Sequence, residues 1–507
     1  MKFNASTKLS TSIPQEVLNI AKKLEENGHQ AFLVGGCVRD LLIKELRPQS
    51  ESDEAPTKVG VEIGPKDWDI ATDVKPEEIQ KLFLDSVYEN QFGTVGVKTE
   101  SEDPTLKVIE VTTFRLEGKY TDKRHPDEIK FAKTIEEDLA RRDFTINAMA
   151  FDKKIIDPYG GQKDLKNKII RTVGNPEERF NEDALRLMRA VRFAAELNFS
   201  IEEKTAAAIK KKAELLAVIA QERIRDELEK IVMAGKAADG IRKLAELNLL
   251  PFIVPELIEG IGVSQNKHHI YEVFDHDVRA LDYAAQKNYS LEVRLASLFH
   301  DIAKPRTKQG EGLNATFYNH EMVGAKMTRQ ILNRLHFPGG IIEKIVHLVR
   351  YHLFYYNVGE VTEAGVRRFL HRVGSENVDD LIKVREADRI GSGVPKAVPY
   401  KIRHLLFMVE KVKQDPISAK MLAVDGEDVM KIGQLESGPK IGKILAILLD
   451  EVLENPEKNI KENLELRIKN LAKLSKDELG KMAEKAKEKK EEFESGLEME
   501  MKKKFFV

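Results

Sequence analysis

Hydrophobic residues recur along this chain with two different spacings. Up to about residue 160, short apolar or alternating runs predict strands mixed with helices. Ala31–Val34, the pair Gly35-Gly36 and the amphipathic stretch Cys37–Leu46 predict a strand, a glycine turn and a helix. The runs 66–72, 94–99 and 106–114 are alternating or β-branched and predict neighbouring strands of one sheet. After Glu177, apolar residues recur at helical spacing and strand signals nearly vanish.

This change of period predicts several regions along the chain. Pro251, Pro255 and the glycines near 260 mark a boundary inside the helical part. The last 52 residues alternate Lys and Glu, which predicts a solvated helix or a disordered tail. A nucleic-acid-binding extension is a weaker alternative for this tail, because its charges nearly cancel. We therefore expect five regions, at 1–160, 161–262, 263–395, 396–455 and 456–507.

Composition narrows the class of protein. The 507 residues carry 82 Lys+Arg against 84 Asp+Glu, so bulk positive charge does not drive binding, and any bound anion must meet a local patch. A single cysteine, Cys37, excludes a disulfide framework and favours a reducing compartment. The polar start of the chain lacks the apolar core of a signal peptide, and no apolar run is long enough for a bilayer. We expect a cytoplasmic protein with no membrane contact and no obligatory protein partner.

Paired carboxylates are the first candidate chemistry. Asp67 and Asp69 are two apart, so on a strand both side chains share one face, with Trp68 on the other. Two like charges this close need a cation, and oxygen-only ligands suit Mg²⁺. Glu110 lies in an otherwise apolar predicted strand and is a natural third ligand. Gly35-Gly36 before a helix offers backbone N–H groups to a phosphate. Each motif alone is weak, since Asp-x-Asp is common at strand edges.

Five motifs in this order resemble the class II tRNA nucleotidyltransferase and bacterial poly(A) polymerase family. The resemblance runs from about residue 30 to 230, and the motifs are Gly35–Asp40, Asp67–Thr72, Arg141–Ala148, Asp157–Gly161 and Glu182–Phe193. It implies an α+β fold, in which a polymerase-beta-like nucleotidyltransferase head, a mixed sheet with helices, is followed by all-α neck, body and HD domains. Two features depart from the family pattern: the polar stretch 47–65 is long, and Phe92 stands where a histidine is expected.

The resemblance also implies roles for the matched residues. Asp67 and Asp69 would hold two Mg²⁺ ions with help from Glu110, so that one ion activates the attacking 3′-hydroxyl and the other steadies the leaving pyrophosphate. Gly36 and Arg39 would cradle the nucleoside triphosphate. Either Arg141 or Arg142 would supply further positive charge, and the sequence does not choose between them.

A predicted helix from Asp183 carries the base-selecting chemistry. Asp183, Arg186, Arg189 and Arg192 are three apart and would lie on one drifting stripe. A carboxylate only accepts hydrogen bonds and a guanidinium only donates them, so the pair Asp183 and Arg186 suits the donor and acceptor edge that cytosine and adenine share. Arg189 and Arg192 would reach phosphates, and Glu182 would support the backbone. An isolated helix face of ion pairs is the plainer alternative.

A second constellation lies downstream. His276, the doublet His300-Asp301, and then His320, His352 and Asp388 resemble the HD phosphohydrolase superfamily. Mixed imidazole and carboxylate ligands suit Mn, Fe, Co or Ni better than Mg²⁺. Such an ion could turn water into hydroxide for attack on phosphorus, for instance at a cyclic or terminal phosphate on RNA. The domain could equally persist only as a fold within a tRNA-binding body.

The main hypothesis is template-independent addition of CCA to tRNA from CTP and ATP. An A-adding enzyme or a poly(A) polymerase of the same family is the nearest alternative, since the sequence does not separate these specificities. A phosphohydrolase whose N-terminal region only binds RNA is a second alternative, and its test is whether the head acids are dispensable. An RNA-binding scaffold without activity is a third, although the neutral net charge gives it no special support.

Overall fold

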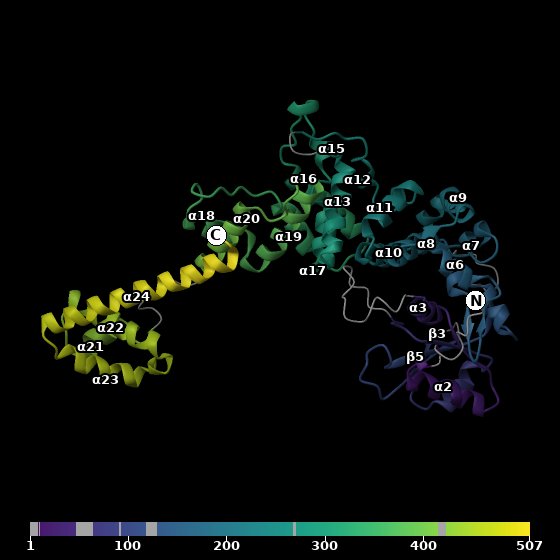
Figure 1. Ribbon diagram of the computed structural model, residues 1–507, viewed down its shortest axis with the longest axis horizontal. Coiled ribbons are helices and arrows are strands. Elements are labelled where there is room, and N and C mark those ends of the chain that lie inside the picture. Colours follow the sequence, from purple (N-terminus) through teal and green to yellow (C-terminus); the bar gives the residue numbers. More distant parts are fainter. Residues whose placement is uncertain are drawn as a thin grey trace. The chain divides into compact units, whose positions relative to one another are not determined.

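The chain forms two compact units in a computed structural model (Figure 1). The structure describes residues 9, 11–46, 64–90, 93–117, 129–266, 270–413 and 422–507. Unit 1 comprises Met1–Leu353 with Asp379–Ala397, and unit 2 comprises Phe354–Val378 with Val398–Val507. Most of the long stretch 47–65, as well as Phe92, lies outside the described residues, so the two departures from the family pattern keep their status as sequence observations.

A mixed seven-stranded sheet organises the head, as the family resemblance implies. Its strand order is β3-β4-β5-β2-β1-β8-β9, in which β2 runs parallel to β5 and the other neighbours are antiparallel. The strands are β1 (Ala31–Val34), β2 (Asp69–Thr72), β3 (Ser86–Asn90), β4 (Thr94–Lys98), β5 (Val108–Thr113), β8 (Ala150–Phe151) and β9 (Ile155–Ile156). Two short strands, β6 (Arg115–Glu117) and β7 (Ile129–Phe131), form a separate ribbon.

Apolar side chains hold the head helix α5 against this sheet. Phe114, Ile135 and Leu139 belong to one buried cluster with residues of β1, β2 and β8. The helices are α2 (Gln15–Glu26), α3 (Gly36–Glu45), α4 (Pro76–Leu82), α5 (Ile135–Ala140) and α6 (Gly161–Asn167). Thr134 closes a capping box at the start of α5, which fixes where that helix begins. The predicted order of strand, glycine turn and helix at residues 31–46 is confirmed.

After the head, the rest of unit 1 is almost entirely helical, as the 3.6-residue period predicts. The neck and body comprise α7 (Pro176–Glu182), α8 (Arg186–Leu197), α9 (Glu203–Lys212), α10 (Gln221–Met233), α11 (Ala237–Glu246) and α12 (Pro255–Ile258). Two short strands, β10 (Ile169–Ile170) and β11 (Ser200–Ile201), pair in parallel beside them. The following helices are α13 (Val273–Gln286), α14 (Leu291–Phe299), α15 (Lys304–Thr307), α16 (His320–Arg334), α17 (Gly339–Tyr351) and α19 (Val378–Gly391).

A buried arginine ties the body to these later helices. Arg294 of α14 is 1% exposed. It donates to the carbonyls of Val232, in the last turn of α10, and of Ala234, just after it, at 3.0 and 3.3 Å, and to the carbonyl of Tyr289 at 2.9 Å. A buried guanidinium is stable only when its N–H groups are satisfied, so these carbonyls and the charge require one another.

Unit 2 is helical and has a core of its own. Its helices are α18 (Glu363–Val373), α20 (Tyr400–Lys413), α21 (Gly426–Gly433), α22 (Pro439–Glu454), α23 (Lys461–Ala472) and α24 (Lys476–Phe505). Ile444 and Leu448 of α22, Ile468 of α23 and Leu479 of α24 belong to one buried cluster. The boundary predicted at residue 456 therefore falls inside this unit.

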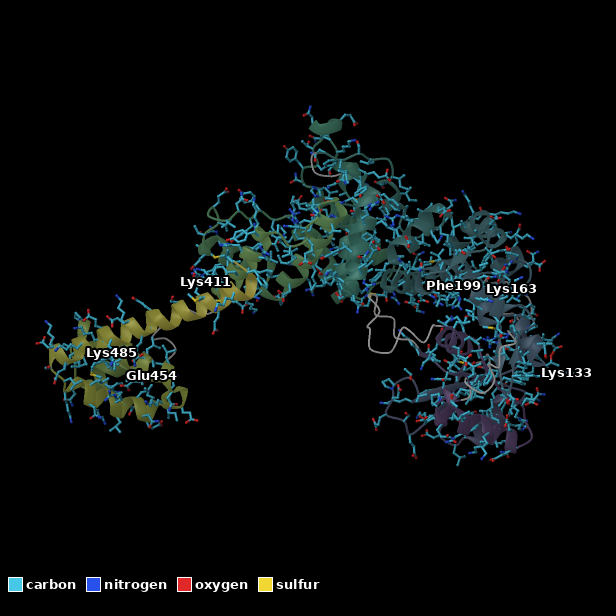
Figure 2. The ribbon with its side chains drawn as sticks, viewed as in Figure 1. Lys133, Lys163, Phe199, Lys411, Glu454 and Lys485 are labelled. Carbon is cyan, nitrogen blue, oxygen red and sulfur yellow. The ribbon has the colours of Figure 1, made fainter. Side chains whose placement is uncertain are left out.

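The Lys/Glu-rich stretch 456–507, predicted as a solvated helix or a disordered tail, forms α23 and α24 of unit 2. A capping box at Ser475 begins α24, which is 30 residues long. Glu454 at the end of α22 pairs with Lys489 of α24 at 2.5 Å, and Lys485 lies nearby (Figure 2). Within the described residues, no helix is both long and apolar enough to cross a bilayer.

Candidate functional site

The three predicted acids meet on one side of the head sheet. Asp69 is the first residue of β2, and its register partner on the parallel strand β5 is Glu110. Directly paired residues of neighbouring strands point to the same face, so these two carboxylates are adjacent. Asp67 is exposed and Trp68 is buried, so the alternation that the sequence predicts extends one residue pair beyond the strand. The strand itself begins at Asp69 and not at Lys66, because residues 66 and 67 form a bend.

Electrostatics supports a cation at these acids. Burial raises the pKa of Asp69, and the neighbouring Asp67 carboxylate raises it further, whereas Arg142 acts in the opposite direction. The site therefore holds negative charges that repel one another. A hard divalent cation with oxygen ligands would relieve that repulsion, so the residues fit Mg²⁺.

The glycine turn brings backbone and positive charge to the same place. Gly35 has φ +75°, and a Cβ on it would lie 2.6 Å from Nη1 of Arg142 and 3.7 Å from Oδ2 of Asp69. The position therefore favours glycine, because φ +75° strains any other residue and a Cβ would displace the end of the Arg142 side chain. Gly36 begins α3, whose first N–H groups point out of the helix end.

The structure distinguishes Arg141 from Arg142, which the sequence did not. Arg142 reaches Gly35 and Asp69, whereas Arg141 donates through Nε to Asp138 at 2.9 Å. Burial acts to raise the pKa of Asp138, but the two guanidinium groups outweigh it and lower that pKa. Arg142 also touches Asp138 at 3.3 Å, so this buried carboxylate holds both arginines in place. Arg142 is the better candidate for nucleotide contact.

Arg39 is held in one orientation by two neighbours. Its Nε and Nη2 atoms donate to Asp40 at 2.7 and 3.0 Å, and Nη1 donates to Oδ1 of Asn147 at 2.9 Å. A guanidinium carries five N–H groups, so two remain beyond these three bonds to the part of the chain that the structure describes. The predicted role of Arg39 at the triphosphate is compatible with this geometry.

The predicted helix from Asp183 begins three residues later. α7 ends at Glu182, Asp183 lies in the turn with φ −132°, and α8 begins at Arg186. Oδ1 of Asp183 accepts from the Leu185 N–H at 3.0 Å, and Oδ2 accepts from Arg223 at 3.3 Å. The single stripe of four residues is therefore wrong for Asp183, because its side chain closes the turn before the helix. Short acidic side chains are favoured at such a position.

Arg186 has partners that the sequence did not predict. Its Nη1 donates to Glu182 at 2.5 Å and its Nη2 to the Arg141 carbonyl at 3.2 Å. Glu182 also pairs with Arg179 at 3.2 Å, so its carboxylate binds two arginines, contrary to the backbone role predicted for it. Asp183 and Arg186 lie at the junction of the head and α8, where the Arg186 N–H donates to the Asp183 carbonyl at 3.1 Å and each side chain has a partner of its own.

The last two arginines of the predicted stripe pair with buried carboxylates. Arg189 donates through Nε to Asp143 at 2.8 Å, and Arg192 donates to Glu227 at 2.8 Å. Burial acts to raise the pKa of Asp143, but Arg189 and Arg186 outweigh it and hold that pKa at about 2. Arg192 and Glu227 are both buried. The predicted phosphate contact of Arg192 therefore conflicts with its packing, since breaking the pair would leave Glu227 buried and charged.

The histidines and aspartates of the second constellation converge in unit 1. All six predicted residues are buried, and they form two groups of potential metal ligands that share Asp301. In the first group, Nε2 of His276 lies 2.9 Å from Nε2 of His300 and 3.1 Å from Oδ2 of Asp301. Asp388 completes this group, with Oδ1 3.5 Å from Nε2 of His276. In the second group, Oδ1 of Asp301 lies 3.3 Å from His320 and 3.7 Å from His352.

Backbone carbonyls orient three of these imidazoles. Nδ1 of His300, His320 and His352 lies 2.8, 2.6 and 2.7 Å from a carbonyl three residues earlier, which leaves Nε2 facing the centre. Outer hydrogen bonds of this kind are typical of metal-ligating histidines. Two imidazoles and two carboxylates around one point, and a carboxylate between two groups, fit a pair of divalent transition ions better than Mg²⁺.

In this centre, the pKa values of the histidines and the position of Lys304 indicate which positive charges a metal ion would replace. Burial acts to lower the pKa of His276, but its bonds to Asp301 and Asp388 raise it to about 10. Burial and the neighbouring His300 lower the pKa of His352 to about 3. Lys304 also contacts Oδ2 of Asp301, and sequence reasoning did not single it out. The centre therefore has protons and an ammonium group in the places where divalent charge would be favourable.

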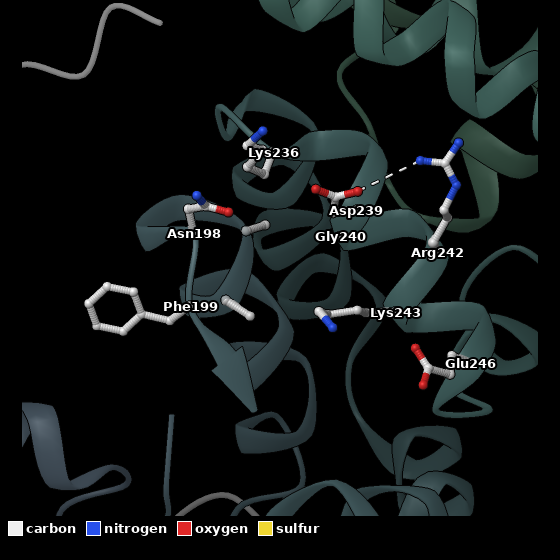
Figure 3. Close-up of a pocket in the computed structure, with 10 residues that line it drawn as sticks. Asn198, Phe199, Lys236, Asp239, Gly240, Arg242, Lys243 and Glu246 are labelled. Atoms are coloured by element: carbon white, nitrogen blue, oxygen red, sulfur yellow. Dashed lines mark ion pairs between the residues drawn. The ribbon is translucent and has the colours of Figure 1, made fainter. Parts of the chain in front are cut away.

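A cavity lies between the end of α8 and α11 (Figure 3). Its volume is about 240 Å³, and Lys236 and Lys243 line it together with Asn198, Phe199 and the ion pair of Asp239 with Arg242. Sequence reasoning missed this feature, because its lining residues are far apart in the chain and none stands in a motif. Asp138, Asn147 and Glu227 were also missed as partners, although Asn147 stands inside a quoted motif.

Comparisons with known families cover most of unit 1. Residues 31–171 match the Poly A polymerase head domain, residues 198–260 match the probable RNA and SrmB-binding site of polymerase A, and residues 273–392 match the HD domain. The matched segments coincide with the head sheet, with the body helices around the cavity, and with the helices that carry the buried histidines. Both domain types use divalent metal ions.

Individual relatives extend the match to nearly the whole chain. A CCA-adding enzyme of Lactobacillus delbrueckii subsp. bulgaricus is 32% identical over 453 residues, which is 89% of this chain and 96% of that enzyme. An A-adding tRNA nucleotidyltransferase of Deinococcus radiodurans is 35% identical over 64% of this chain and 76% of its own length. The CCA-adding enzyme of Geobacillus kaustophilus is 42% identical, but the match spans only 54% of it.

A solved structure shares the fold. The crystal structure of the Bacillus stearothermophilus CCA-adding enzyme in complex with CTP covers 90% of this chain and 96% of its own, with a TM-score of 0.57 and 30% sequence identity.

Proposed function

Because this chain belongs to the family of CCA-adding and A-adding tRNA nucleotidyltransferases, we propose that it adds C, C and A to the 3′ end of tRNA from CTP and ATP, without a nucleic-acid template. The carrying observation is the register pair Asp69 and Glu110, with Asp67 beside it and Gly35 and Arg142 against it. This arrangement places oxygen ligands next to a phosphate-binding turn, which nucleotidyl transfer needs.

Two Mg²⁺ ions at Asp67, Asp69 and Glu110 would lower the pKa of the attacking 3′-hydroxyl and neutralise the leaving pyrophosphate. The residues of the chain position the reactants. Gly36 presents helix N–H groups to the triphosphate, and Arg39 donates its two remaining N–H groups from an orientation fixed by Asp40 and Asn147. Arg142 adds positive charge beside Asp69.

Asp183 and Arg186 would select the base from the junction of the head and α8. An accepting carboxylate and a donating guanidinium together match the amine and ring nitrogen of cytosine and adenine, and leave uracil or guanine unpaired. Arg223 donates to Asp183, and Arg186 donates to Glu182, so both base-selecting side chains are oriented before a nucleotide binds. Because Arg192 is buried against Glu227, we assign it to the packing of α8 and not to phosphate contact.

The body would hold the tRNA mainly through phosphates and shape. The matched RNA-binding segment 198–260 includes Lys236 and Lys243 of the cavity, and these lysines supply local positive charge on a nearly neutral chain. The single cysteine, Cys37, is buried and unpaired, which suits the cytoplasmic location that we propose.

The buried histidine centre favours a second, independent activity. We propose that His276, His300, Asp301 and Asp388 hold one transition ion and that Asp301, His320 and His352 hold another. Such ions supply a metal-activated hydroxide for attack on a phosphoester. Lys304 beside Asp301 would position a phosphate oxygen. The substrate class would be a terminal or cyclic phosphate on RNA, whose removal leaves the hydroxyl that nucleotide addition requires.

One assay tests the main proposal against its alternatives. The protein is incubated with Mg²⁺, labelled CTP and ATP, and tRNA that lacks its last three nucleotides. Ordered incorporation of C, C and A supports CCA addition, whereas A-only products select the A-adding or poly(A) alternative. Opening of a tRNA 2′,3′-cyclic phosphate to the monoester, or release of phosphate from a terminal 3′-phosphate, without nucleotide addition, would leave only the phosphohydrolase. Binding without any product would leave the scaffold.

A further inference from the structure

A continuous chain of hydrogen bonds links the glycine turn to α8. Arg39 donates to Oδ1 of Asn147 at 2.9 Å, Nδ2 of Asn147 donates to Oδ1 of Asp143 at 3.3 Å, and Oδ2 of Asp143 accepts from Arg189 at 2.8 Å. Asp143 and Asn147 are both buried. The chain therefore runs through the protein interior, where hydrogen bonds between charged groups are strong.

An aromatic ring supports the same connection. The Arg39 and Arg189 guanidinium groups each lie 5.3 Å from the centre of the Phe193 ring, and Arg192 lies 4.4 Å from it. Phe193 also meets Phe144 edge to face at 5.7 Å. The negative face of an aromatic ring attracts cations, so Phe193 keeps three like charges close together. Arg39 comes from the head and the other two arginines come from α8.

The two ends of this chain stand beside different parts of the proposed nucleotide site. Arg39 follows the glycine turn that would hold the triphosphate, and Arg189 lies one helical turn after Arg186, which would read the base. A base is rejected effectively only when its edge and its phosphates are held in one fixed geometry. A connection of fixed length between the two ends would provide that geometry.

We propose that Asn147 is a positioning residue for base selection, which couples the triphosphate cradle at Arg39 to the base-selecting helix through Asp143 and Arg189. This inference rests on the proposed nucleotidyl transfer. Asn147 accepts from a cation with one atom and donates to a carboxylate with the other. Among side chains of this size, only an amide or a protonated carboxyl does both. Leucine does neither, and an ionised aspartate would accept from Arg39 but repel Asp143.

The test compares two variants of the full-length protein with a matched control. Asn147→Leu and Asn147→Asp are assayed for kcat and KM with CTP, ATP, UTP and GTP on tRNA lacking its last nucleotides. We expect the ratio of kcat/KM for CTP over UTP to fall about tenfold in both variants at pH 8, the size of one lost interaction to a charged group. Asn147→Asp should lose at least as much as Asn147→Leu, because its carboxylate keeps the bond from Arg39 but repels Asp143.

Thr145→Val is the matched control. Thr145 is buried in the same turn and donates to Asp164 at 2.7 Å, outside the proposed connection. This variant should lose thermal stability and keep its base selection. An unchanged CTP over UTP ratio in folded Asn147→Leu, or an equal loss in Thr145→Val, would overturn the inference. If Asn147→Leu does not fold, the CTP over UTP ratio of Asn147→Asp decides alone.

The design separates this inference from the proposed function. If the unmodified protein adds no nucleotide, nucleotidyl transfer is wrong and the role of Asn147 falls with it. If the unmodified protein adds C and A and rejects U and G while Asn147→Leu does the same, only the coupling is wrong.

Discussion

Unit 1 gathers acidic side chains at two places, the head and the histidine centre, and the two places differ in exposure and in ligand type. In the head, Asp67 is exposed, and Asp69 and Glu110 lie side by side near the glycine turn. In the histidine centre every ligand candidate is buried, and three imidazoles are fixed by backbone carbonyls. The head site is open and built from oxygen alone, whereas the other is enclosed and mixes nitrogen with oxygen.

The difference teaches how each site treats its cation. An open oxygen site holds Mg²⁺ weakly and leaves room for the phosphates of a substrate, so that metal and nucleotide complete one another. An enclosed site with oriented imidazoles retains an ion between turnovers, since its geometry exists beforehand. We therefore expect the metal content of the purified protein to report on the histidine centre, and the Mg²⁺ dependence of activity to report on the head.

The largest expected effect is the loss of nucleotide addition when an acid of the head is removed, with the histidine centre left intact. Asp67→Ala or Asp69→Ala should lower CCA addition by about 10³-fold or more, because the repelling carboxylates would no longer hold the ions that stabilise the transition state. The bound transition metal should be unchanged, and the thermal midpoint should not fall. Single-turnover addition measures the rate, elemental mass spectrometry measures the bound metal, and thermal melting measures the midpoint. Addition near the wild-type rate would refute the assignment of these acids.

The converse change should empty the histidine centre. Asp301→Asn removes the ligand that both groups share, so we expect the affinity for Mn²⁺ or Co²⁺ to fall by more than about a hundredfold. Addition of C and A should stay within about twofold of wild type. Asp275→Asn is the control, because Asp275 precedes His276 but pairs with Arg242 and Arg279. Metal retention in Asp301→Asn would contradict the shared ligand.

A smaller effect is expected where the head meets α8. Asp183→Ala should reduce the preference for CTP over UTP about tenfold, because the lost carboxylate accepts a hydrogen bond from the base. The rate with CTP should fall less, because Asp183 does not take part in the chemical step. Glu177→Ala removes an exposed acid of α7 that pairs with Lys211, and it should change neither quantity. Unchanged rejection of UTP and GTP in Asp183→Ala would count against selection by the protein.

The smallest effect concerns stability without metal. The pKa of Asp69 is raised by burial and by Asp67, so its ionised form destabilises the metal-free fold. Asp69→Asn should therefore raise the melting temperature near pH 7 by about 2 °C in the presence of EDTA. The gain should vanish as the pH falls through the raised pKa of Asp69 towards the ordinary aspartate value near 3.9. Below that value Asp69 is uncharged in both the folded and the unfolded protein. Added Mg²⁺ should reverse the order of the two proteins.

Sequence reasoning succeeded where a local pattern determines local structure. The strand at 31–34, the glycine turn and the placement of Glu110 beside Asp69 follow from alternation, from the φ that only glycine tolerates easily, and from strand pairing. It failed where partners come from distant segments. Nothing near Arg192 indicates Glu227, and a regular spacing of three cannot show that Asp183 closes a turn before α8 begins.

The charged end of the chain shows the same limit. Alternating Lys and Glu predict a solvated helix or a disordered segment, and the few apolar residues among them carry little signal. Leu479 and Ala486 nevertheless pack into the core of unit 2, because α22 and α23 present an apolar surface to α24. The ligands of the histidine centre were found because an adjacent His-Asp pair is an unusual local pattern, whereas Lys304 has no comparable signal.

The buried Arg294 described above has a practical consequence for dissecting this protein. Its guanidinium donates to carbonyls at the end of α10 and in the loop before α14. A truncation between those helices would therefore leave a buried cation without partners on one fragment and unpaired carbonyls on the other. The helices that carry the histidines are therefore not an independent domain that can be separated from α10. Inactivating them calls for point substitutions, and grafting them onto another protein calls for transplanting α10 as well.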